Sequence, residues 1–287
     1  DARHRNMKNN PHRATMTGAA TQPLTAANQA CSIEPLAPFR QLVIDGMSLG
    51  ARKHNIHGLI EVDITAARAR IQEIKAQTGE APSFTGWIVY CCARAVDADK
   101  HVHAYRDWRN RLLLFDDVDV SLPVERAQAG QPVVLQTVIR AANRKSVADI
   151  HREIRALQGK ELGDTSWGRW LRWYVLIPGP LRRLFFRLAA TRPVVLKRFN
   201  GTVLVTSVGM YGKVSGWGLP LAGHSLAVTI GGIEDKPVLV DGAVHNRPHL
   251  RLTVTFDHDI VDGGPAARFI QRFAELIQAG AGLADAP

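Results

Sequence analysis

Hydrophobic residues follow two different spacings in the first part of this chain, and each spacing predicts an element. The run Gly58–Val62 has the character of a strand, and Asp63 after it can cap a helix. Apolar positions then recur at helical spacing until Gly79, which ends that helix. Ser83 precedes a second helix, at residues 84–96, that is apolar almost all round, so we expect it at a central position in the fold.

β-branched residues mark the predicted strands in the middle of the chain. Residues 111–122 and 131–139 are expected to pair as a hairpin. Ser146 and Asp149 form a capping signature for the helix that follows, whose apolar stripe continues to Leu157. After residue 200, four runs closed by glycine-containing turns are predicted to be strands, at residues 201–207, 225–233, 236–242 and 249–256.

The last predicted strand and the last predicted helix meet at a tight turn. Apolar and polar residues alternate from Leu250 to Phe256, which predicts a strand with one buried face. A helix is predicted at residues 264–278, and Pro265 suits its first turn. The chain therefore ends with a strand, a turn and a helix, and its whole order of elements mixes strands with helices.

Composition limits the classes to which this protein can belong. Its 287 residues are 46% hydrophobic, enough to bury a substantial core. No stretch approaches the roughly 20 apolar residues that a membrane-spanning helix needs. The three cysteines, Cys31, Cys91 and Cys92, provide no disulfide framework because sequence neighbours pair poorly, so we expect reduced thiols and a cytoplasmic location.

The formal net charge of +10 is concentrated in two segments. Residues 166–200 hold eight Lys or Arg and no acidic residue, and residues 1–35 contribute a further +2. A duplex-binding face needs basic groups spread over a folded surface, so we expect no nucleic-acid partner. Residues 1–35 also lack periodicity and a secretory signal, which predicts a disordered leader before a folded domain at residues 36–287.

One histidine stands where the last strand meets the last helix, in the sequence Phe256-Asp257-His258-Asp259-Ile260-Val261-Asp262-Gly263-Gly264. Strand backbone would hold the imidazole of His258 rigidly while the turn exposes it to a cleft, an arrangement that suits a general base. One histidine among eleven is a weak signal by itself, because most histidines are surface or structural residues. The surrounding pattern adds to it.

His-x-x-x-Asp-Gly between a strand and a helix resembles the signature shared by dihydrolipoamide acyltransferases, chloramphenicol acetyltransferases and related enzymes. The run TFDHDIVDGGPAARFIQRFAELI is similar to the carboxy-terminal stretch of the dihydrolipoamide group. Several earlier segments resemble that group in the same order: IEVDITAARARIQEI, VIRAANRKSVADIHREI, GTVLVTSVGMYG, AVTIGGIEDKPV and KPVLVDGAVHNRPHLRLTVTFDH. The resemblance covers residues 36–160 and 199–280.

The resemblance implies an α/β fold of the two-layer α+β kind, a chloramphenicol acetyltransferase-like mixed sheet with packed helices. It also implies a homotrimer or higher assembly, with a channel at each subunit interface that admits acyl-CoA from one side and an acceptor thiol from the other. Acyl-CoA is then a substrate, and neither a tightly bound cofactor nor a metal is expected. The catalytic domain would be residues 36–287.

The resemblance also assigns roles to residues of this sequence. His258 would take the proton of the acceptor thiol as the sulfur attacks the thioester carbonyl, which contributes about 10²–10⁴ in rate. Thr206 matches the family's hydroxyl donor to the tetrahedral intermediate, and Ser207 beside it is the fallback and a candidate substrate contact. Asp262 would shape the turn that presents His258, through hydrogen bonds or an ion pair.

Gly263 and Gly264 complete the candidate substrate-binding residues, because glycine allows backbone angles or close approach that a side chain would block. Asp259 stands where dihydrolipoamide acyltransferases usually have Arg, so we expect altered partner or substrate contacts.

The sequence shows no lipoyl domain, and a lipoyl group would therefore be supplied by another polypeptide. An amine, an alcohol or a carrier protein is an alternative acceptor, and a catalytically silent trimeric scaffold is the alternative from another class.

A basic aromatic insert at about residues 161–200 interrupts the resemblance. Apolar positions at helical spacing lie on both sides of a break at Pro178–Pro180: Trp167, Trp170, Leu171 and Tyr174 before it, and Leu181, Leu184, Phe185 and Leu188 after it. Such composition suits peripheral contact with an anionic membrane through residues 166–198. An acidic partner, a cover over the trimer's own channel and a packed hairpin with solvated arginines are the alternatives.

Overall fold

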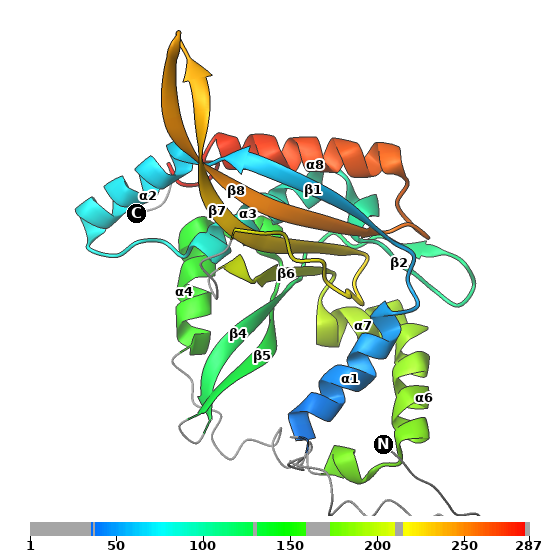
Figure 1. Ribbon diagram of the computed structural model, residues 1–287. Helices are drawn as coiled ribbons and strands as arrows, with labels where there is room; N and C mark the ends of the chain where they lie inside the picture. The colour runs from blue at the N-terminus through cyan, green and yellow to red at the C-terminus, as the bar shows by residue number, and fades with distance from the viewer. Residues whose placement is uncertain (1–35, 37, 129–130, 159–172, 210–214, 285–287) are drawn as a thin grey trace, which may run out of the picture. The chain divides into compact units, whose positions relative to one another are not determined.

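One mixed sheet organises this chain, whose structure is a computed structural model describing residues 36, 38–128, 131–158, 173–209 and 215–284 (Figure 1). Its strands are β1 (Asn55–Asp63), β4 (Val120–Gln128), β5 (Gln131–Ile139), β6 (Val203–Ser207), β7 (Leu226–Val240) and β8 (Ala243–Asp257). They lie in the order β1-β8-β7-β6-β4-β5. β6 runs parallel to β4 and β7, whereas the other neighbours are antiparallel, so the predicted mixed sheet is confirmed.

Four helices pack against the sheet and against one another: α2 (Thr65–Thr78), α3 (Phe84–Ala98), α4 (Val147–Gln158) and α8 (Gly263–Gln278). α3 contacts both α4 and α8, which confirms the predicted central position. Trp87 of α3 is fully buried, and its indole nitrogen donates to the carbonyl oxygen of Ala281 at 3.0 Å. Burying a large apolar side chain stabilises the fold by about 1.5–3 kcal/mol, so α3 contributes much of the core.

The predicted helix starts follow the cap chemistry closely. Ser83 accepts a hydrogen bond from the amide of Gly86 at 3.2 Å, as an N-cap residue should. Ser146 and Asp149 exchange backbone-to-side-chain bonds of 3.1 Å each, the reciprocal pattern of a capping box. Asp63 accepts from the amide of Thr65 at 2.8 Å, although Ile64 holds the formal N-cap position and α2 begins one residue later than expected.

The prediction of a single strand at residues 111–122 is wrong. Leu112–Leu113 forms β3, which pairs with β2 (Tyr105–Arg106) in a separate two-stranded sheet, and β4 begins only at Val120. Between them the amide of Val118 donates to the side-chain oxygen of Asn143 at 3.0 Å. Because such amides bind side chains instead of a neighbouring strand, the β-branched run is interrupted. The predicted hairpin with residues 131–139 is confirmed as β4 and β5.

Residues 225–233 and 236–242 form one strand, not the two that were predicted. The register of β7 against β8 shifts between Ile230 and Ile233, at the glycine pair. A Cβ atom at Gly231 would lie 2.3 Å from the carbonyl oxygen of Gly216, so close backbone approach explains this glycine. Beyond the shift, β7 and β8 extend as a two-stranded arm that ends in an Asp-Gly turn (Figure 1).

The second face of β8 is covered, which corrects the prediction of one buried face. Thr253 and Thr255 are as buried as their apolar neighbours. The segment 215–224 lies over this face: Arg251 donates to the carbonyl oxygen of Ser215 at 2.8 Å, and a Cβ atom at Gly218 would meet the methyl group of Thr229 at 2.9 Å. The centre of the sheet is therefore enclosed on both sides.

A further group of helices was only partly predicted: α1 (Pro38–Gly50), α6 (Gly179–Ala190) and α7 (Pro193–Asn200). α6 contacts α1 and α7, and α7 contacts β5, within a compact unit that spans residues 37–287. No helix within the described ranges combines the length and the apolar character of a membrane-spanning segment. The predicted leader at residues 1–35, with Cys31, and the insert residues Trp167, Trp170 and Leu171 lie outside the described residues.

Cys91 and Cys92 are free thiols buried in α3. Burial raises the pKa of Cys92 to about 12, because the thiolate would lose its hydration. The thiol therefore stays neutral and serves as a packing group, as the sequence predicts.

Candidate active site

His258 lies on the turn between β8 and α8, where the sequence predicts it. β8 ends at Asp257, and the amide of His258 donates to the carbonyl oxygen of His54 at 2.8 Å. Two amides later in the turn donate to the carbonyl oxygen of Asp257 at 3.0 Å. The imidazole itself is 46% exposed. Backbone bonds therefore fix the turn while the ring remains accessible to a reactant.

The residue before His258 forms a buried ion pair. The carboxylate of Asp257 is 6% exposed and pairs with the ammonium group of Lys53. Its other oxygen accepts from the amide of Asp259 at 3.2 Å. A buried carboxylate with both oxygens engaged holds its surroundings rigidly, so Lys53 and Asp257 position the turn that carries His258.

Asp259 has partners within its own chain. One carboxylate oxygen lies 2.8 Å from Nδ1 of His54, and the other accepts from Arg106 at 3.2 Å. The hydrogen bond with His54, and after it the positive charge of Arg106, hold the pKa of Asp259 below its ordinary value. Asp259 thus connects the residue before β1, and Arg106 of β2, to the histidine turn.

The expected hydrogen bonds of Asp262 do not form. Its carboxylate lies 3.8 Å from Nδ1 of His258, which is beyond hydrogen-bond distance, and its side chain is 86% exposed. Asp262 occupies the N-cap position of α8 without a capping bond from its side chain. Among the described residues, the contact that remains for this carboxylate is the 3.8 Å approach to the imidazole of His258.

The two glycines after Asp262 are not required by geometry within one chain. Neither Gly263 nor Gly264 has a positive φ. A Cβ atom at Gly263 would meet nothing within 4 Å, and one at Gly264 would meet only the end of the Arg268 side chain at 3.6 Å. The prediction that these positions need glycine for backbone angles or close approach is therefore wrong inside a single subunit.

Thr206 and Ser207 end β6, both partly buried. Thr206 pairs with Thr229 of β7, and Thr229 pairs with Thr253 of β8, so these threonines form a row across three strands. Among the described residues neither Thr206 nor Ser207 has a hydrogen-bond partner for its hydroxyl group. Both hydroxyl groups are available as donors.

The sheet register does not bring Thr206 to His258. The row that contains Thr206 crosses β8 at Thr253, and His258 follows five residues later. Five residues of strand span about 16 Å, and two strand spacings add about 10 Å across the sheet. A hydroxyl group and an imidazole this far apart cannot act on one carbonyl group within a single chain.

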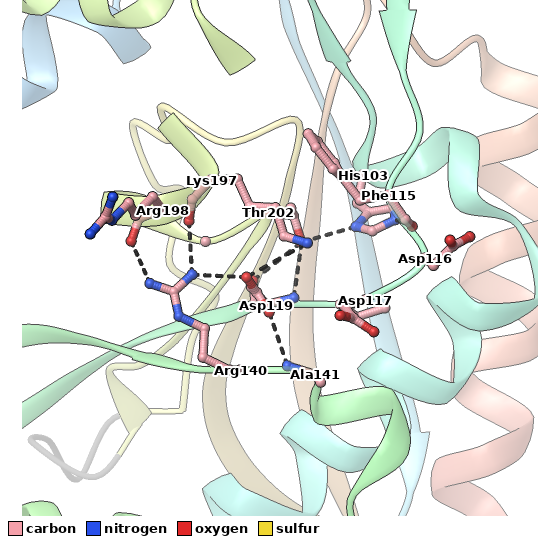
Figure 2. A network of polar contacts seen from close by, with 12 residues as sticks. His103, Phe115, Asp116, Asp117, Asp119, Arg140, Ala141, Lys197, Arg198 and Thr202 are labelled. Atoms are coloured by element: carbon pink, nitrogen blue, oxygen red, sulfur yellow. Dashed lines mark hydrogen bonds and ion pairs between the residues drawn. The ribbon is translucent and has the colours of Figure 1, made fainter. Parts of the chain in front are cut away.

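The beginning of β6 is anchored by a polar network (Figure 2). Thr202 accepts from the amide of Asp119 at 3.2 Å, and the Asp119 carboxylate accepts from Arg140 at 2.8 Å. Arg140 also donates to the carbonyl oxygens of Lys197 and Arg198 in the last turn of α7. This arginine therefore fixes the end of α7 to the sheet, just before the strand that carries Thr206.

Two buried histidines serve structure and were not singled out by sequence. Nδ1 of His103 lies 2.9 Å from the hydroxyl oxygen of Thr202, and its Nε2 donates to the carbonyl oxygen of Phe115 at 3.1 Å. Nε2 of His224 donates to the carbonyl oxygen of Asn200 at 2.6 Å. Burial lowers the pKa of each imidazole to about 4, so both stay neutral.

A hollow of about 390 Å³ lies between α3 and α8. Its lining includes Tyr90, Arg94, Arg272 and Leu276 and none of the predicted site residues. Within the part of the chain that the structure describes, no three His, Cys, Asp or Glu side chains gather as metal ligands would. The motif, and not this hollow, marks the candidate site.

Comparison of this sequence with models of known protein families identifies one matching family. The profile described as 2-oxoacid dehydrogenases acyltransferase (catalytic domain) matches residues 28–164 and 197–284. The dihydrolipoyllysine-residue succinyltransferase component of the mitochondrial 2-oxoglutarate dehydrogenase complex from Saccharomyces cerevisiae is 24% identical over 225 residues. That match covers 76% of this chain and 41% of the relative. The chain therefore spans about two fifths of the length of this curated relative.

Solved structures share the fold. The cubic core of the pyruvate dehydrogenase multienzyme complex superposes with a TM-score of 0.65 at 17% identity, over 93% of this chain and 100% of that one. Dihydrolipoamide acetyltransferase from Azotobacter vinelandii gives the same TM-score and the same coverage of both chains at 18% identity. The latter structure addresses the role of a serine, a histidine and an asparagine in the catalytic mechanism. The predicted fold class is confirmed.

Proposed function

Because this chain belongs to the 2-oxoacid dehydrogenase acyltransferase family, we propose that it transfers an acyl group between a coenzyme A thioester and an acceptor thiol of the dihydrolipoyl type. The observation that carries the proposal is the placement of His258 on a turn held by backbone bonds and by the buried Lys53–Asp257 pair. An accessible imidazole on rigid backbone is what general-base catalysis requires.

The proposed reaction moves one proton and exchanges one thioester bond for another. The imidazole of His258 takes the proton of the acceptor thiol while the sulfur attacks the thioester carbonyl carbon. The tetrahedral intermediate then expels the coenzyme A sulfur, and the imidazolium returns the proton to it. Such a base contributes about 10²–10⁴ in rate.

Thr206 is our candidate for the hydroxyl group that stabilises the negatively charged oxygen, a contribution of about 10²–10³ in turnover. The Azotobacter acetyltransferase supports this choice. Its serine precedes its histidine by 52 positions, the same interval that separates Thr206 from His258. Its asparagine follows the histidine by four positions, as Asp262 does here. Ser207 remains the fallback donor.

The separation of Thr206 from His258 leads us to propose that two copies of the chain complete each site. A head-to-tail contact places different surfaces of two identical subunits together, and closure of such contacts gives a ring. A homotrimer of this kind would form three sites, each with His258 from one subunit and Thr206 from the next. Acyl-CoA and a lipoyl group would approach this interface.

The experiment is release of free coenzyme A thiol from a panel of acyl-CoA donors with dihydrolipoamide as acceptor. We expect acceptor-dependent release by the parent protein and a loss of at least about 10²-fold in His258→Ala. His245→Ala, which changes an exposed histidine on the two-stranded arm, is the matched control and should retain activity. No release with any donor, or full activity in His258→Ala, would contradict the proposal.

A further inference from the structure

Helix α6 turns its apolar stripe toward solvent. Leu181, Leu184, Phe185 and Leu188 recur at the spacing of one helix face, and their exposed fractions lie between 49% and 61%. In a surface helix of a globular protein, an apolar stripe of this kind normally faces the core. The orientation of α6 is therefore the reverse of the usual one.

A buried polar cluster fixes that orientation. Arg182, on a different face of α6, is buried, and its Nε donates to the Asp45 carboxylate of α1 at 2.8 Å. The hydroxyl group of Tyr174 donates to the same carboxylate oxygen at 2.7 Å. Burial by itself raises the pKa of Asp45, but the hydrogen bonds from Tyr174 and Arg182 outweigh it and hold the pKa below its ordinary value. The helix cannot roll its stripe inward without breaking this charged cluster.

The charged residues in the segment that carries this exposed stripe are all basic. From residue 173 to residue 200 the chain has six Lys or Arg and no acidic residue. Arg183 and Arg187, one turn apart on α6, are also exposed. The helical turn before α6 adds exposed Trp173 and Leu176. We call this surface the insert face: Trp173, Leu176, Leu181, Arg183, Leu184, Phe185, Arg187 and Leu188.

The family profile does not cover this surface. The family profile matches the chain up to residue 164 and again from residue 197, so the insert face lies wholly in the gap. The acyl-transfer chemistry of the family therefore gives no reason for an exposed, basic, apolar helix here. Contiguous apolar surface on a soluble protein usually marks a place of interaction.

We propose that the insert face docks this protein on the surface of a membrane that contains anionic lipids. The apolar stripe would enter the boundary between headgroups and acyl chains, as interfacial helices do. Trp173 suits the headgroup level, and the long, exposed side chains of Arg183 and Arg187 would bend toward lipid phosphates at that level. The absence of acidic residues from the whole stretch is the charge complementarity that favours this occupant over an ordinary protein surface.

Vesicle co-sedimentation of the full chain tests the proposal. We expect binding to vesicles of phosphatidylcholine mixed with phosphatidylglycerol, weaker binding to phosphatidylcholine alone, and loss of the difference at high salt. The double substitution Leu184→Ser with Phe185→Ser should abolish binding. Leu114→Ser is the matched control, because Leu114 is as exposed as Leu184, at 49%, and lies outside the insert face.

A second pair of substitutions keeps the test decisive if the serine variant fails to fold. Arg183→Gln with Arg187→Gln leaves the apolar stripe intact and should weaken partition into the mixed vesicles about thirtyfold. Failure of the parent protein to bind either kind of vesicle would overturn the proposal. A change in oligomeric state by analytical ultracentrifugation in Leu184→Ser with Phe185→Ser, without vesicle binding by the parent, would assign the face to a second copy of the chain instead.

Discussion

The strand register separates Thr206 from His258 by five residues along β8 and two strands across the sheet. A donor to the reacting oxygen must come within about 3 Å of it, so one chain cannot apply both groups to one carbonyl. We propose that the two groups act together on one thioester carbonyl. If they do, each subunit contributes halves of two different sites, and assembly is a condition of activity.

The pair behind His258 should matter more than pairs of similar appearance on the surface. Lys53→Met leaves the Asp257 carboxylate buried without a counterion, which should lower the free energy of unfolding by about 3–5 kcal/mol in urea titrations. Lys236→Met, which removes a more exposed pair with Glu61, is the control and should cost less than about 1 kcal/mol. Equal losses in the two variants would show that the pair does not position the turn.

The free energy of unfolding should decrease as the pH is lowered through a window that is set by the pKa values of His103 and His224. The folded pKa of each is lowered to about 4 from 6.5, so between these values the unfolded chain binds protons that the folded chain does not. Stability is therefore full above about pH 6.5 and should decrease by about 2 kcal/mol per histidine by pH 5. Urea unfolding at pH 7 and pH 5 measures the loss.

Glutamine at either histidine isolates its contribution to that slope. His103→Gln and His224→Gln should each remove about half of the pH dependence, because glutamine does not titrate. Both variants will also change stability at pH 7, so the difference between the two pH values is the quantity to compare. A slope unchanged in both variants would mean that other groups cause it.

Sequence patterns predicted the elements that local chemistry determines. The cap at Ser83, the capping box of Ser146 and Asp149, and the final strand, turn and helix all follow from bonds between residues close in sequence. In the turn that presents His258, two amides bond locally to the carbonyl oxygen of Asp257, whereas His54 and Lys53 hold the same turn from about 200 residues away. Periodicity and residue type suffice for the features that depend on few distant contacts.

The errors have long-range causes. The strand predicted at residues 111–122 is divided because Asn143 and Thr202 bind its backbone amides from elsewhere in the chain. The alternation in sequence places Thr253 on a solvent face, but segment 215–224 covers that face. Asp259 gives no sequence signal of its contacts with His54 and Arg106, which lie about 150–200 residues away. Only the assembled sheet places these groups together.

The cluster that anchors α6 predicts a local change in stability. Asp45→Asn leaves Arg182 buried without a full counter-charge, so α1 and α6 should lose hydrogen-exchange protection while α3 keeps it. Asp149→Asn, whose partner Arg152 is exposed, is the control and should leave α6 unchanged. Retained protection of α6 in Asp45→Asn would contradict the anchoring role.

Gly201 and Gly79 distinguish steric crowding from backbone strain. Both have positive φ, but a Cβ atom at Gly201 would lie 2.6 Å from the carbonyl oxygen of Asp119, whereas one at Gly79 meets nothing within 4 Å. Gly79→Ala should therefore cost about 1–2 kcal/mol. Gly201→Ala should cost more, by thermal and urea unfolding, because it also displaces the network around Asp119. Equal costs would argue against close packing at the start of β6.

The most direct test of the shared site is complementation between two inactive variants. His258→Ala and Thr206→Ala, each purified alone, should be strongly impaired in coenzyme A release, and co-expression in equal amounts should assemble mixed oligomers. If each site takes His258 from one subunit and Thr206 from the next, random mixing restores about a quarter of the sites. Recovery toward about a quarter of parental activity is the predicted result. Activity of the mixed oligomers no higher than that of the two variants measured separately would contradict a site built from two subunits.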